Sequence, residues 1–278
     1  MILILGATGQ VGRALTALLG PDKCRALTRS EARLDHPEEL ATRLDRLKPS
    51  AIINAAAYTA VDLAEKEKDS ARTINALAPG VLARWCAEHD IPFIHYSTDY
   101  VFSGEGDRPW QELDPIAPLN TYGATKAEGE SRIAAAGGKW LIFRTSWVYD
   151  ADGKNFLNTM LRFGAERETL RVVADQHGAP TYAPHLARAT LQALEKALQL
   201  PVFPSGIYHL CNSGETTWHT FAQAIFEKAR ALQIPLKVQS VDAISSAEFP
   251  TPARRPSNSR MDLSKIRNTF SFSSDPLV

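Results

Sequence analysis

Met1-Ile2-Leu3-Ile4-Leu5-Gly6-Ala7-Thr8-Gly9-Gln10-Val11-Gly12 is the stretch that decides the fold. Its apolar start predicts a buried strand, and apolar side chains then recur at helical spacing up to Leu18. Between the two, Gly6 allows a tight turn, Gly9 lets the backbone approach a pyrophosphate, and Gly12 permits close packing of the helix on the strand. The helix N-terminus adds free N–H groups for an anion. This order predicts a dinucleotide site. The expected contacts are Gly6, Thr8, Gly9, Gln10, Val11 and Gly12.

The same alternation of strand and helix continues through the first half of the chain. Short apolar runs stand at 24–28, 51–54, 91–96 and 140–144. Helical patterns separate them, and one of these carries Ala71, Ile74, Leu77, Leu82 and Trp85. Short buried strands linked by helices predict βαβ units in a doubly wound parallel sheet, which is an α/β fold of the Rossmann type.

The alternation of short strands and helices becomes irregular after Val148. Helices are expected at 156–163, 183–200 and 217–232, and strands at 170–173 and 206–210. We therefore predict a dinucleotide-binding domain over residues 1–148, to which 182–210 returns. A smaller C-terminal substrate-binding lobe is expected from 149–181 and 211–278.

Composition narrows the classes of partner and the compartment. The 278 residues include 31 basic and 31 acidic side chains, so no overall field directs the chain to nucleic acid or a membrane. The apolar start is too short for a signal sequence or a membrane span. Cys24, Cys86 and Cys211 are odd in number and far apart, which argues against a disulfide framework or a zinc site. These features predict a cytoplasmic protein.

No metal site is predicted, because the histidines lack ligand spacing such as H-E-x-x-H. The histidines considered are His177, His185, His209 and His219.

Thr28-Arg29-Ser30, at the end of the second predicted strand, bears on the choice of cofactor. An acidic residue there would accept hydrogen bonds from a free ribose 2′-OH. Arg29 instead suits a 2′-phosphate, which favours NADPH over NADH. An ordinary surface arginine is the alternative, and Asp35 is placed to meet the adenosine. NADPH is therefore expected, with NADH still open.

Tyr122-Gly123-Ala124-Thr125-Lys126 places a tyrosine and a lysine at positions i and i+4 of a helix expected from about Thr121. An ammonium at about 4 Å, with an effective dielectric of about 20, contributes on the order of 4 kcal/mol in favour of the phenolate. We therefore expect Lys126 to lower the pKa of Tyr122 and the phenol to protonate a carbonyl that becomes an alkoxide. A surface pair is the alternative. Thr98 supports catalysis, since it follows the run 91–96, at the strand end where open sheets bind ligands.

Six further strings accompany the glycine loop. They are Asn54–Asp62 (NAAAYTAVD), Ser97–Phe102 (STDYVF), Asn120–Lys126, Arg144–Tyr149 (RTSWVY), Asp175–Thr181 and Arg255–Ser259. Together they resemble the dTDP-4-dehydrorhamnose reductase family of extended short-chain dehydrogenases. The strings at 54–62 and 97–102 are the most specific of the set, and the resemblance extends to about residue 266.

The resemblance implies reduction of the 4-keto group of dTDP-4-dehydro-β-L-rhamnose to dTDP-β-L-rhamnose, with NADPH as the reductant. Carried onto matching positions, it implies Thr98, Tyr122 and Lys126 as catalytic residues, with Lys126 also holding the nicotinamide ribose. Cofactor contacts are implied for Ala55, Ala56, Ala57, Tyr58, Asn75, Tyr122 and Lys126. Contacts with the dTDP-4-keto-6-deoxy sugar are implied for Thr98, Asp99, Tyr100, Tyr122, Trp147, Arg255 and Asn258. The alternatives to substrate contact are that Trp147 is a core residue and that Arg254-Arg255 is a solvated pair.

Two positions depart from the family pattern. Some members carry a glutamate on the first helix that joins a magnesium-bridged dimer, and here that position is Ala14. A homodimer is expected to lack this metal. The end of the chain, 270–278, lacks the expected tryptophan-containing helix, so we expect it to fray.

Two alternative functions come from related proteins. One is another nucleotide-sugar enzyme, either a different reductase, an epimerase or a dehydratase, which would use the same tyrosine and lysine. Dehydratases, however, typically show Thr-Asp-Glu where this chain has Thr98-Asp99-Tyr100. A non-catalytic NADP-binding subunit, similar to the regulatory subunit of methionine adenosyltransferase, is disfavoured because Thr98, Tyr122 and Lys126 are all retained.

Overall fold

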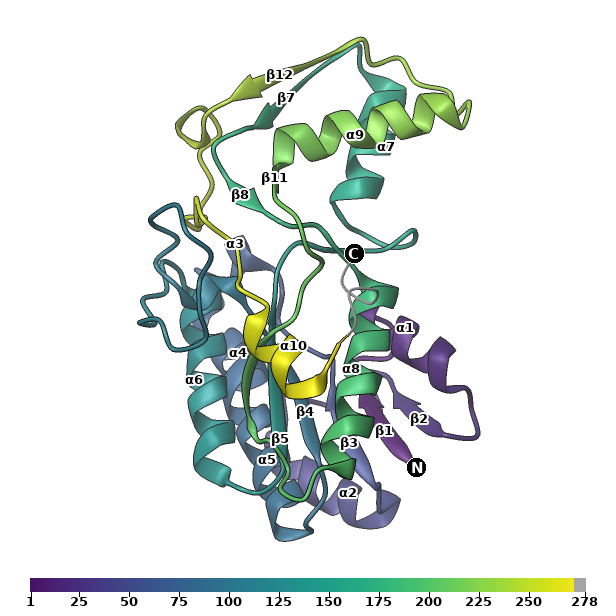
Figure 1. Ribbon diagram of the computed structural model, residues 1–278, viewed down its shortest axis with the longest axis vertical. Coiled ribbons are helices and arrows are strands. Elements are labelled where there is room, and N and C mark those ends of the chain that lie inside the picture. The colour runs from purple at the N-terminus through teal and green to yellow at the C-terminus, as the bar shows by residue number, and fades with distance from the viewer. Residues whose placement is uncertain (273–278) are drawn as a thin grey trace.

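A six-stranded sheet forms the centre of the larger part of the molecule (Figure 1). The computed structural model describes residues 1–272. The strands follow the order β10-β5-β4-β3-β1-β2, and every pairing in this sheet is parallel. Their bounds are β1 (Ile2–Leu5), β2 (Cys24–Leu27), β3 (Ala51–Asn54), β4 (Phe93–Thr98), β5 (Trp140–Thr145) and β10 (Gly206–His209). The predicted doubly wound, Rossmann-type fold is confirmed.

Helices cover both faces of the sheet, which explains why its strands are apolar on both sides. Successive strand residues alternate between the two cores, so Ile4 and Ile53 face one and Leu3 and Ile52 face the other. The first core is covered by α1 (Gln10–Leu19), α8 (Ala183–Gln199) and α10 (Ser264–Phe270). The second is covered by α2 (Leu40–Leu47), α5 (Ala78–Glu88) and α6 (Thr121–Ala136), and the short turn η1 (Pro37–Glu39), which has no buried residue, precedes α2.

The strand order reverses between β1 and β3, and open sheets bind ligands at such a switch point. Gly6 lies there with a φ of +82°, and a Cβ on it would stand 2.7 Å from the amide nitrogen of Ala56. A Cβ on Gly12 would stand 2.1 Å from the carbonyl oxygen of Gly6. Both positions therefore require glycine, and their packing brings α1 directly onto the loop.

The helix expected around residues 71–85 is a helical run in three parts. It consists of α4 (Lys68–Arg72), the π-helical turn η2 (Thr73–Leu77) and α5, and the short α3 (Val61–Ala64) precedes it. π turns within helices recur at functional sites. Here the turn carries the buried Asn75, and a Cβ on Gly129 of α6 would stand 2.2 Å from the Asn75 carbonyl oxygen. The turn and α6 are thus in close backbone contact.

A smaller lobe sits beyond the carboxyl ends of the sheet strands (Figure 1). It contains α7 (Phe156–Glu166), α9 (Trp218–Ala231) and the parallel pair β7 (Thr169–Val173) and β12 (Ser240–Ile244). Its separate apolar core includes Met160, Leu170, Val172, Ile225 and Phe226. Two further short pairs are β6 (Val148–Tyr149) with β9 (Thr181–Tyr182) and β8 (His177–Gly178) with β11 (Thr216–Thr217). Figure 1 shows β8 and β11 between the lobe and the sheet.

The end of the chain returns from the lobe to the sheet. Met261, Leu263, Ile266 and Phe270 are buried in the first core, although the sequence analysis assigned 211–278 to the lobe. The Lys196 ammonium donates to the carbonyl oxygens of Phe270 and Ser271. The expected fraying therefore does not apply to 270–272, and residues 273–278 lie outside the described part of the chain. Among residues 1–272, no helix combines the length and apolar character needed to cross a membrane.

Candidate active site

The glycine loop opens at the N-terminus of α1, where Gly9 is the N-cap. The exposed Thr8 lies on this loop, and Val11 packs partly against the first core. The Gln10 side-chain amide donates to the carbonyl oxygen of Val148 at 3.3 Å and accepts from Asn155 at 3.0 Å. The loop is therefore linked through Gln10 to the chain that enters the lobe.

Beyond β2 lies an open cavity of about 670 Å³. It is lined by Thr8, Thr28, Arg29, Ser30, Arg33 and Asp35. The guanidinium groups of Arg29 and Arg33 lie 3.4 Å and 3.3 Å from the Asp35 carboxylate, and the Arg33 hydrogen bond lowers the pKa of Asp35. Arg29 is 79% exposed in its side chain, so its donors are available to a ligand. Sequence reasoning missed Arg33, whose position on the turn after β2 only the folded chain reveals.

Residues 55–58 follow β3 and form a backbone wall against Gly6, which Ala55 and Ala56 contact directly. The Ala55 amide donates to the Leu5 carbonyl oxygen at 3.0 Å. Asn75 holds the far end, because its Oδ1 accepts from the Tyr58 amide at 2.8 Å and its Nδ2 donates to the Tyr58 carbonyl oxygen at 3.1 Å. The same Nδ2 lies 3.2 Å from the Thr125 hydroxyl. Asn75 thus ties the wall to α6, one residue from Lys126.

Thr98 and Tyr122 come from two different elements and lie close together. Thr98 ends β4 and caps η3 (Asp99–Val101), its hydroxyl accepting from the Tyr100 amide at 3.2 Å and donating to Asp99 at 3.0 Å. Tyr122 stands in the first turn of α6, which Asn120 caps by accepting from the Gly123 amide at 2.9 Å. Gly123 lets this turn approach η3, since a Cβ there would lie 2.1 Å from the Tyr100 carbonyl oxygen.

Burial raises the pKa of Tyr122 to about 12, and the nearby Asp99 adds to the rise. A hydrogen bond with Thr98 opposes it in part. The direction is opposite to the lowering expected from the sequence, because Lys126 does not act on the phenol in the way the i, i+4 spacing suggested. Tyr122 therefore keeps its proton at neutral pH in the ligand-free protein.

Lys126 is 1% exposed and points into the sheet. Its amine bonds to the Tyr96 carbonyl oxygen and lies 3.0 Å from Nε2 of His95, a fully buried residue of β4. Desolvation lowers the pKa of Lys126 to about 7, although the Glu130 carboxylate raises it in part. The helix thus brings Tyr122 and Lys126 to one region, while the structure directs the amine to His95 and Tyr96.

Glu130, one turn beyond Lys126, forms a buried ion pair with Arg144 of β5. The side chains are 2% and 1% exposed, and two hydrogen bonds of 2.9 Å and 2.7 Å join them. Arg144 also donates to the Glu112 carbonyl oxygen at 3.2 Å and stacks over the Phe102 ring. This pair fastens the helix that carries the site to the sheet beneath it.

Asp99 and Tyr100 stand where β4 meets the crevice. Asp99 is 2% exposed, and burial raises its pKa to about 6 against hydrogen bonds from Ser259 and Thr98. The Tyr100 ring meets the Tyr122 ring edge-on, with centroids 5.6 Å apart. Burial also raises the pKa of Tyr100. The Thr98 hydroxyl is therefore bonded to the Asp99 carboxyl group and to the neutral Tyr122 phenol, and the Tyr100 ring packs against the ring of that phenol.

A cleft of about 1080 Å³ separates the sheet from the lobe. Tyr100 and Arg255 line it from the sheet side, and Phe156, Met160 and Trp218 line it from the lobe. Arg255 donates to Asp62 at 2.8 Å and to the Ala253 carbonyl oxygen at 3.0 Å. Arg255 is therefore fixed at the cleft by these hydrogen bonds, and it does not form a solvated pair with Arg254. Asp62 is a lining residue that the sequence analysis did not single out.

Trp147 and Asn258 occupy different surroundings from the other substrate candidates. Trp147 adopts a left-handed φ of 49° and stacks on Trp218 with ring centroids 3.6 Å apart. Asn258 is 1% exposed, and its amide group is used by the backbone at Arg108 and Arg260. The stacked tryptophan pair lies at the cleft through Trp218, whereas the bonds of Asn258 hold the 104–110 loop to the chain end.

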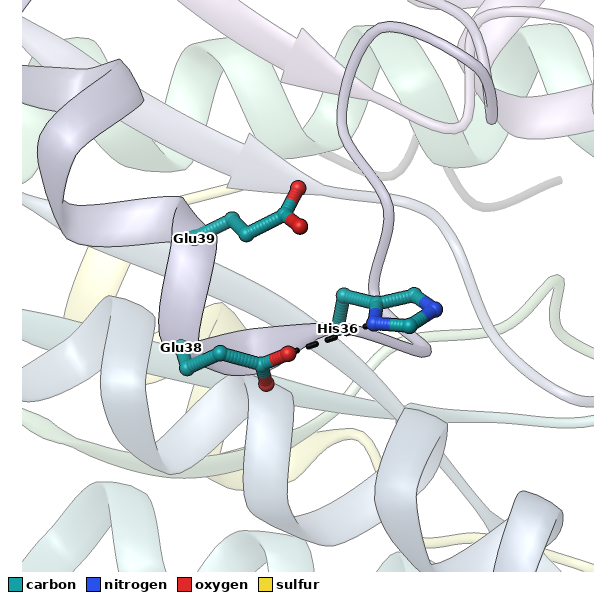
Figure 2. A group of neighbouring side chains, drawn as sticks. All are labelled: His36, Glu38 and Glu39. Atoms are coloured by element: carbon teal, nitrogen blue, oxygen red, sulfur yellow. Dashed lines mark hydrogen bonds and ion pairs between the residues drawn. The ribbon is translucent and has the colours of Figure 1, made fainter.

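One exposed group in residues 1–272 has the composition of a metal site. Figure 2 shows His36, Glu38 and Glu39 at the start of α2, with His36 Nδ1 3.2 Å from Glu38. This grouping was not predicted, because the turn of η1 brings the three side chains together. It lies on the surface, outside both cavities described above.

Comparisons with known proteins agree over nearly the whole chain. A family model described as the RmlD substrate binding domain matches residues 1–277. A dTDP-4-dehydrorhamnose reductase of Burkholderia thailandensis is 46% identical over 277 residues, covering 97% of this chain and 92% of the relative. The dTDP-4-dehydrorhamnose reductase of Escherichia coli K12 is 45% identical over 283 residues, covering 98% and 92%.

Solved structures give the same result for the fold. The crystal structure of a dTDP-4-dehydrorhamnose reductase from Bacillus anthracis, in complex with NADP, superposes with a TM-score of 0.88. It is 35% identical in sequence, and the match covers 96% of this chain and 92% of that one.

Proposed function

The chain belongs to the dTDP-4-dehydrorhamnose reductase family, and we propose that it reduces the 4-keto group of dTDP-4-dehydro-β-L-rhamnose to give dTDP-β-L-rhamnose, with NADPH as the reductant. The observation that carries this proposal is the joint placement of Thr98 and Tyr122 where β4 ends, with the Tyr122 ring packed against Tyr100, which lines the cleft. Family membership favours this reaction over the epimerase and the regulatory-subunit alternatives.

The residues at the switch point fit a dinucleotide. Gly6 and Gly12 leave no room for a Cβ, so the backbone at the start of α1 is bare. The cavity beside β2 offers two guanidinium groups, which suit a 2′-phosphate. The cofactor supplies the hydride. This chain's part is to hold it with residues 6–12, 55–58, Asn75 and Lys126, and to place the nicotinamide beside Tyr122.

The proton step belongs to Tyr122. Its burial keeps the phenol protonated, and the alkoxide formed on reduction is a stronger base than a phenolate, so transfer from the Tyr122 hydroxyl runs downhill. The Thr98 hydroxyl, which donates to Asp99 in the ligand-free protein, turns its one proton to the substrate oxygen and so orients it. Across the cleft, Tyr100, Arg255 and Trp218 contact the sugar nucleotide, with Arg255 on the diphosphate.

The direct test follows NADPH consumption with freshly generated dTDP-4-dehydro-β-L-rhamnose. We expect oxidation of NADPH that depends on both enzyme and sugar nucleotide and yields dTDP-β-L-rhamnose by mass spectrometry. Turnover with other nucleotide-linked keto sugars, but not with this one, would reassign the substrate.

Replacement of both cavity arginines tests the preference for NADPH. In Arg29→Ala/Arg33→Ala we expect kcat/KM with NADPH to fall by about 10- to 100-fold, since hydrogen bonds between charged groups contribute about 1.5–3 kcal/mol. The value with NADH should change little and serves as the internal control. An equal loss with both cofactors would show that the arginines act on the fold and not on the 2′-phosphate.

Lys126→Ala is expected to weaken turnover and cofactor binding together. Loss of one amine contact to the ribose should raise the Kd of NADPH by about 10-fold, measured by protein fluorescence quenching. Lys139→Ala, an exposed lysine paired with Asp90, is the matched control. An unchanged Kd in Lys126→Ala would remove the ribose from the role of this lysine.

A cytoplasmic location and a homodimer that needs no magnesium complete the proposal. The three cysteines are free and buried, which suits a reducing compartment. Ala14, at the position of the glutamate found in some family members, is buried within the chain's own core.

Activity is therefore expected to survive exhaustive chelation, because Tyr122 supplies the proton and Ala14 offers no ligand. The measurement is NADPH oxidation and size by light scattering, before and after EDTA. Loss of activity, or dissociation that Mg²⁺ alone restores, would contradict it.

A further inference from the structure

A chain of four polar groups runs inside the sheet and ends on Lys126. The Ala56 amide nitrogen lies 3.1 Å from Asn54 Oδ1, and Asn54 Nδ2 lies 3.1 Å from His95 Nδ1. His95 Nε2 in turn lies 3.0 Å from the Lys126 amine. Asn54 and His95 are fully buried and Lys126 is 1% exposed, so water does not replace these partners.

The backbone sets the direction of every bond in this chain. A peptide N–H can only donate, so the atom of Asn54 that faces Ala56 must be its oxygen. The amide nitrogen of Asn54 therefore faces His95 and donates to Nδ1. An imidazole nitrogen that accepts carries no proton, which leaves the ring proton of neutral His95 on Nε2. Nε2–H then points at Lys126.

An ammonium has three donors and no acceptor, so it cannot accept from Nε2–H. A neutral amine has one lone pair and two N–H bonds. It accepts from His95, donates to the Tyr96 carbonyl oxygen and retains one N–H. We propose that this chain fixes His95 as the tautomer protonated on Nε2 and thereby holds Lys126 as a neutral amine in the cofactor-free protein. His95 is thus a positioning residue.

The surrounding charges agree with this assignment. The carboxylate that favours an ammonium at Lys126 is Glu130, and it is already bound to Arg144 by two hydrogen bonds. His95 is itself kept neutral, since burial and the neighbouring Lys126 lower its pKa well below the usual range. Tyr122, one turn before Lys126, remains a neutral phenol. The pKa of Lys126, lowered to about 7, is in the direction that this bonding requires.

The consequence concerns how the proposed proton donor is prepared, and it rests on the proposed function for Tyr122 and Lys126. A neutral amine carries no charge that would stabilise the Tyr122 phenolate. With its pKa lowered to about 7, it is also too weak a base to deprotonate a phenol whose pKa is about 12, so Tyr122 keeps its proton for the reduction.

Nuclear magnetic resonance of the cofactor-free protein tests the proposal directly. Long-range ¹H–¹⁵N spectra of the imidazole rings, with His95 assigned from His95→Gln, should show one tautomer protonated on Nε2 from about pH 8 to about pH 9. The ¹³Cε signal lost in Lys126→Met should titrate near pH 7. A proton on Nδ1 of His95, or a Lys126 titration at the ordinary value of about 10.4, would overturn the proposal.

Asn54→Asp reverses the direction of the hydrogen bond to His95, because a carboxylate accepts from both the Ala56 amide and His95. The proton of His95 should move to Nδ1, and the Lys126 titration should shift upward. Asn75→Asp adds the same charge near Lys126 without touching His95, and there the tautomer should stay on Nε2. A tautomer that does not change in Asn54→Asp would also contradict the proposal. These readouts need neither cofactor nor substrate, so their failure is distinct from failure of the NADPH assay.

Discussion

Tyr122→Phe is expected to lower turnover by about 10²–10⁴-fold while NADPH binding stays largely intact, because the change removes a proton donor and little else. Phenylalanine keeps the ring that packs edge-on against Tyr100, so the site should retain its shape. The loss belongs to the chemical step, in which the alkoxide takes its proton from the Tyr122 hydroxyl.

Single-turnover kinetics under saturating NADPH measure this effect without interference from product release. The matched control is Tyr149→Phe, a tyrosine of β6 whose ring packs against Tyr182 away from Thr98. Turnover of the purified Tyr122→Phe protein close to the unmodified rate would assign the acid to another residue. Asp99 would be the first candidate, since its pKa is raised to about 6.

Glu130→Ala is expected to lower the free energy of unfolding by about 3–5 kcal/mol, because it leaves the Arg144 guanidinium buried without its counter-charge. Both side chains are almost fully inaccessible, and the pair joins α6 to β5. The loss should appear as a lower midpoint in urea unfolding with an unchanged slope.

Glu128→Ala on the same helix is the matched control. Glu128 pairs with Arg72 and Arg132 at 2.8 Å but is 31% exposed, so its removal should cost only about 0.2–1 kcal/mol. Equal losses in the two variants would mean that the buried pair adds nothing beyond a surface ion pair.

The sheet could be predicted from sequence because its strands are buried on both faces and appear as short apolar runs. β4 shows where this signal ends. Pro92 lies before the strand, and polar Ser97 and Thr98 extend it in register with Arg144 and Thr145 of β5. The apolar run stops at Tyr96, so hydrophobicity alone cannot predict that the next two residues continue the strand through backbone pairing.

The site was only partly predictable, since spacing places residues on a helix face without saying what the sheet offers them. Tyr122 and Lys126 do share a face, but His95 on a neighbouring strand takes the amine, and no local pattern announces that. Arg33 and Asp62 were missed for the same reason, because their partners lie in segments distant in sequence or across a turn. The motif suggested that Asn258 could bind substrate, but in the folded chain its side-chain amide is hydrogen-bonded to the backbone of Arg108 and Arg260.

The route of the chain through the lobe also sets an order of assembly. β7 pairs with β12, whose residues come about 70 positions later, and Met261, Leu263 and Ile266 complete the sheet core only after the lobe. Closing a loop of this length costs conformational entropy before the new contacts can stabilise the fold, so these pairings form late. As the chain leaves the ribosome, the second core, whose buried residues lie between Leu3 and Ile142, can therefore form first. The cleft between the sheet and the lobe, lined by residues as late as Ser257, follows only when almost the entire polypeptide has emerged.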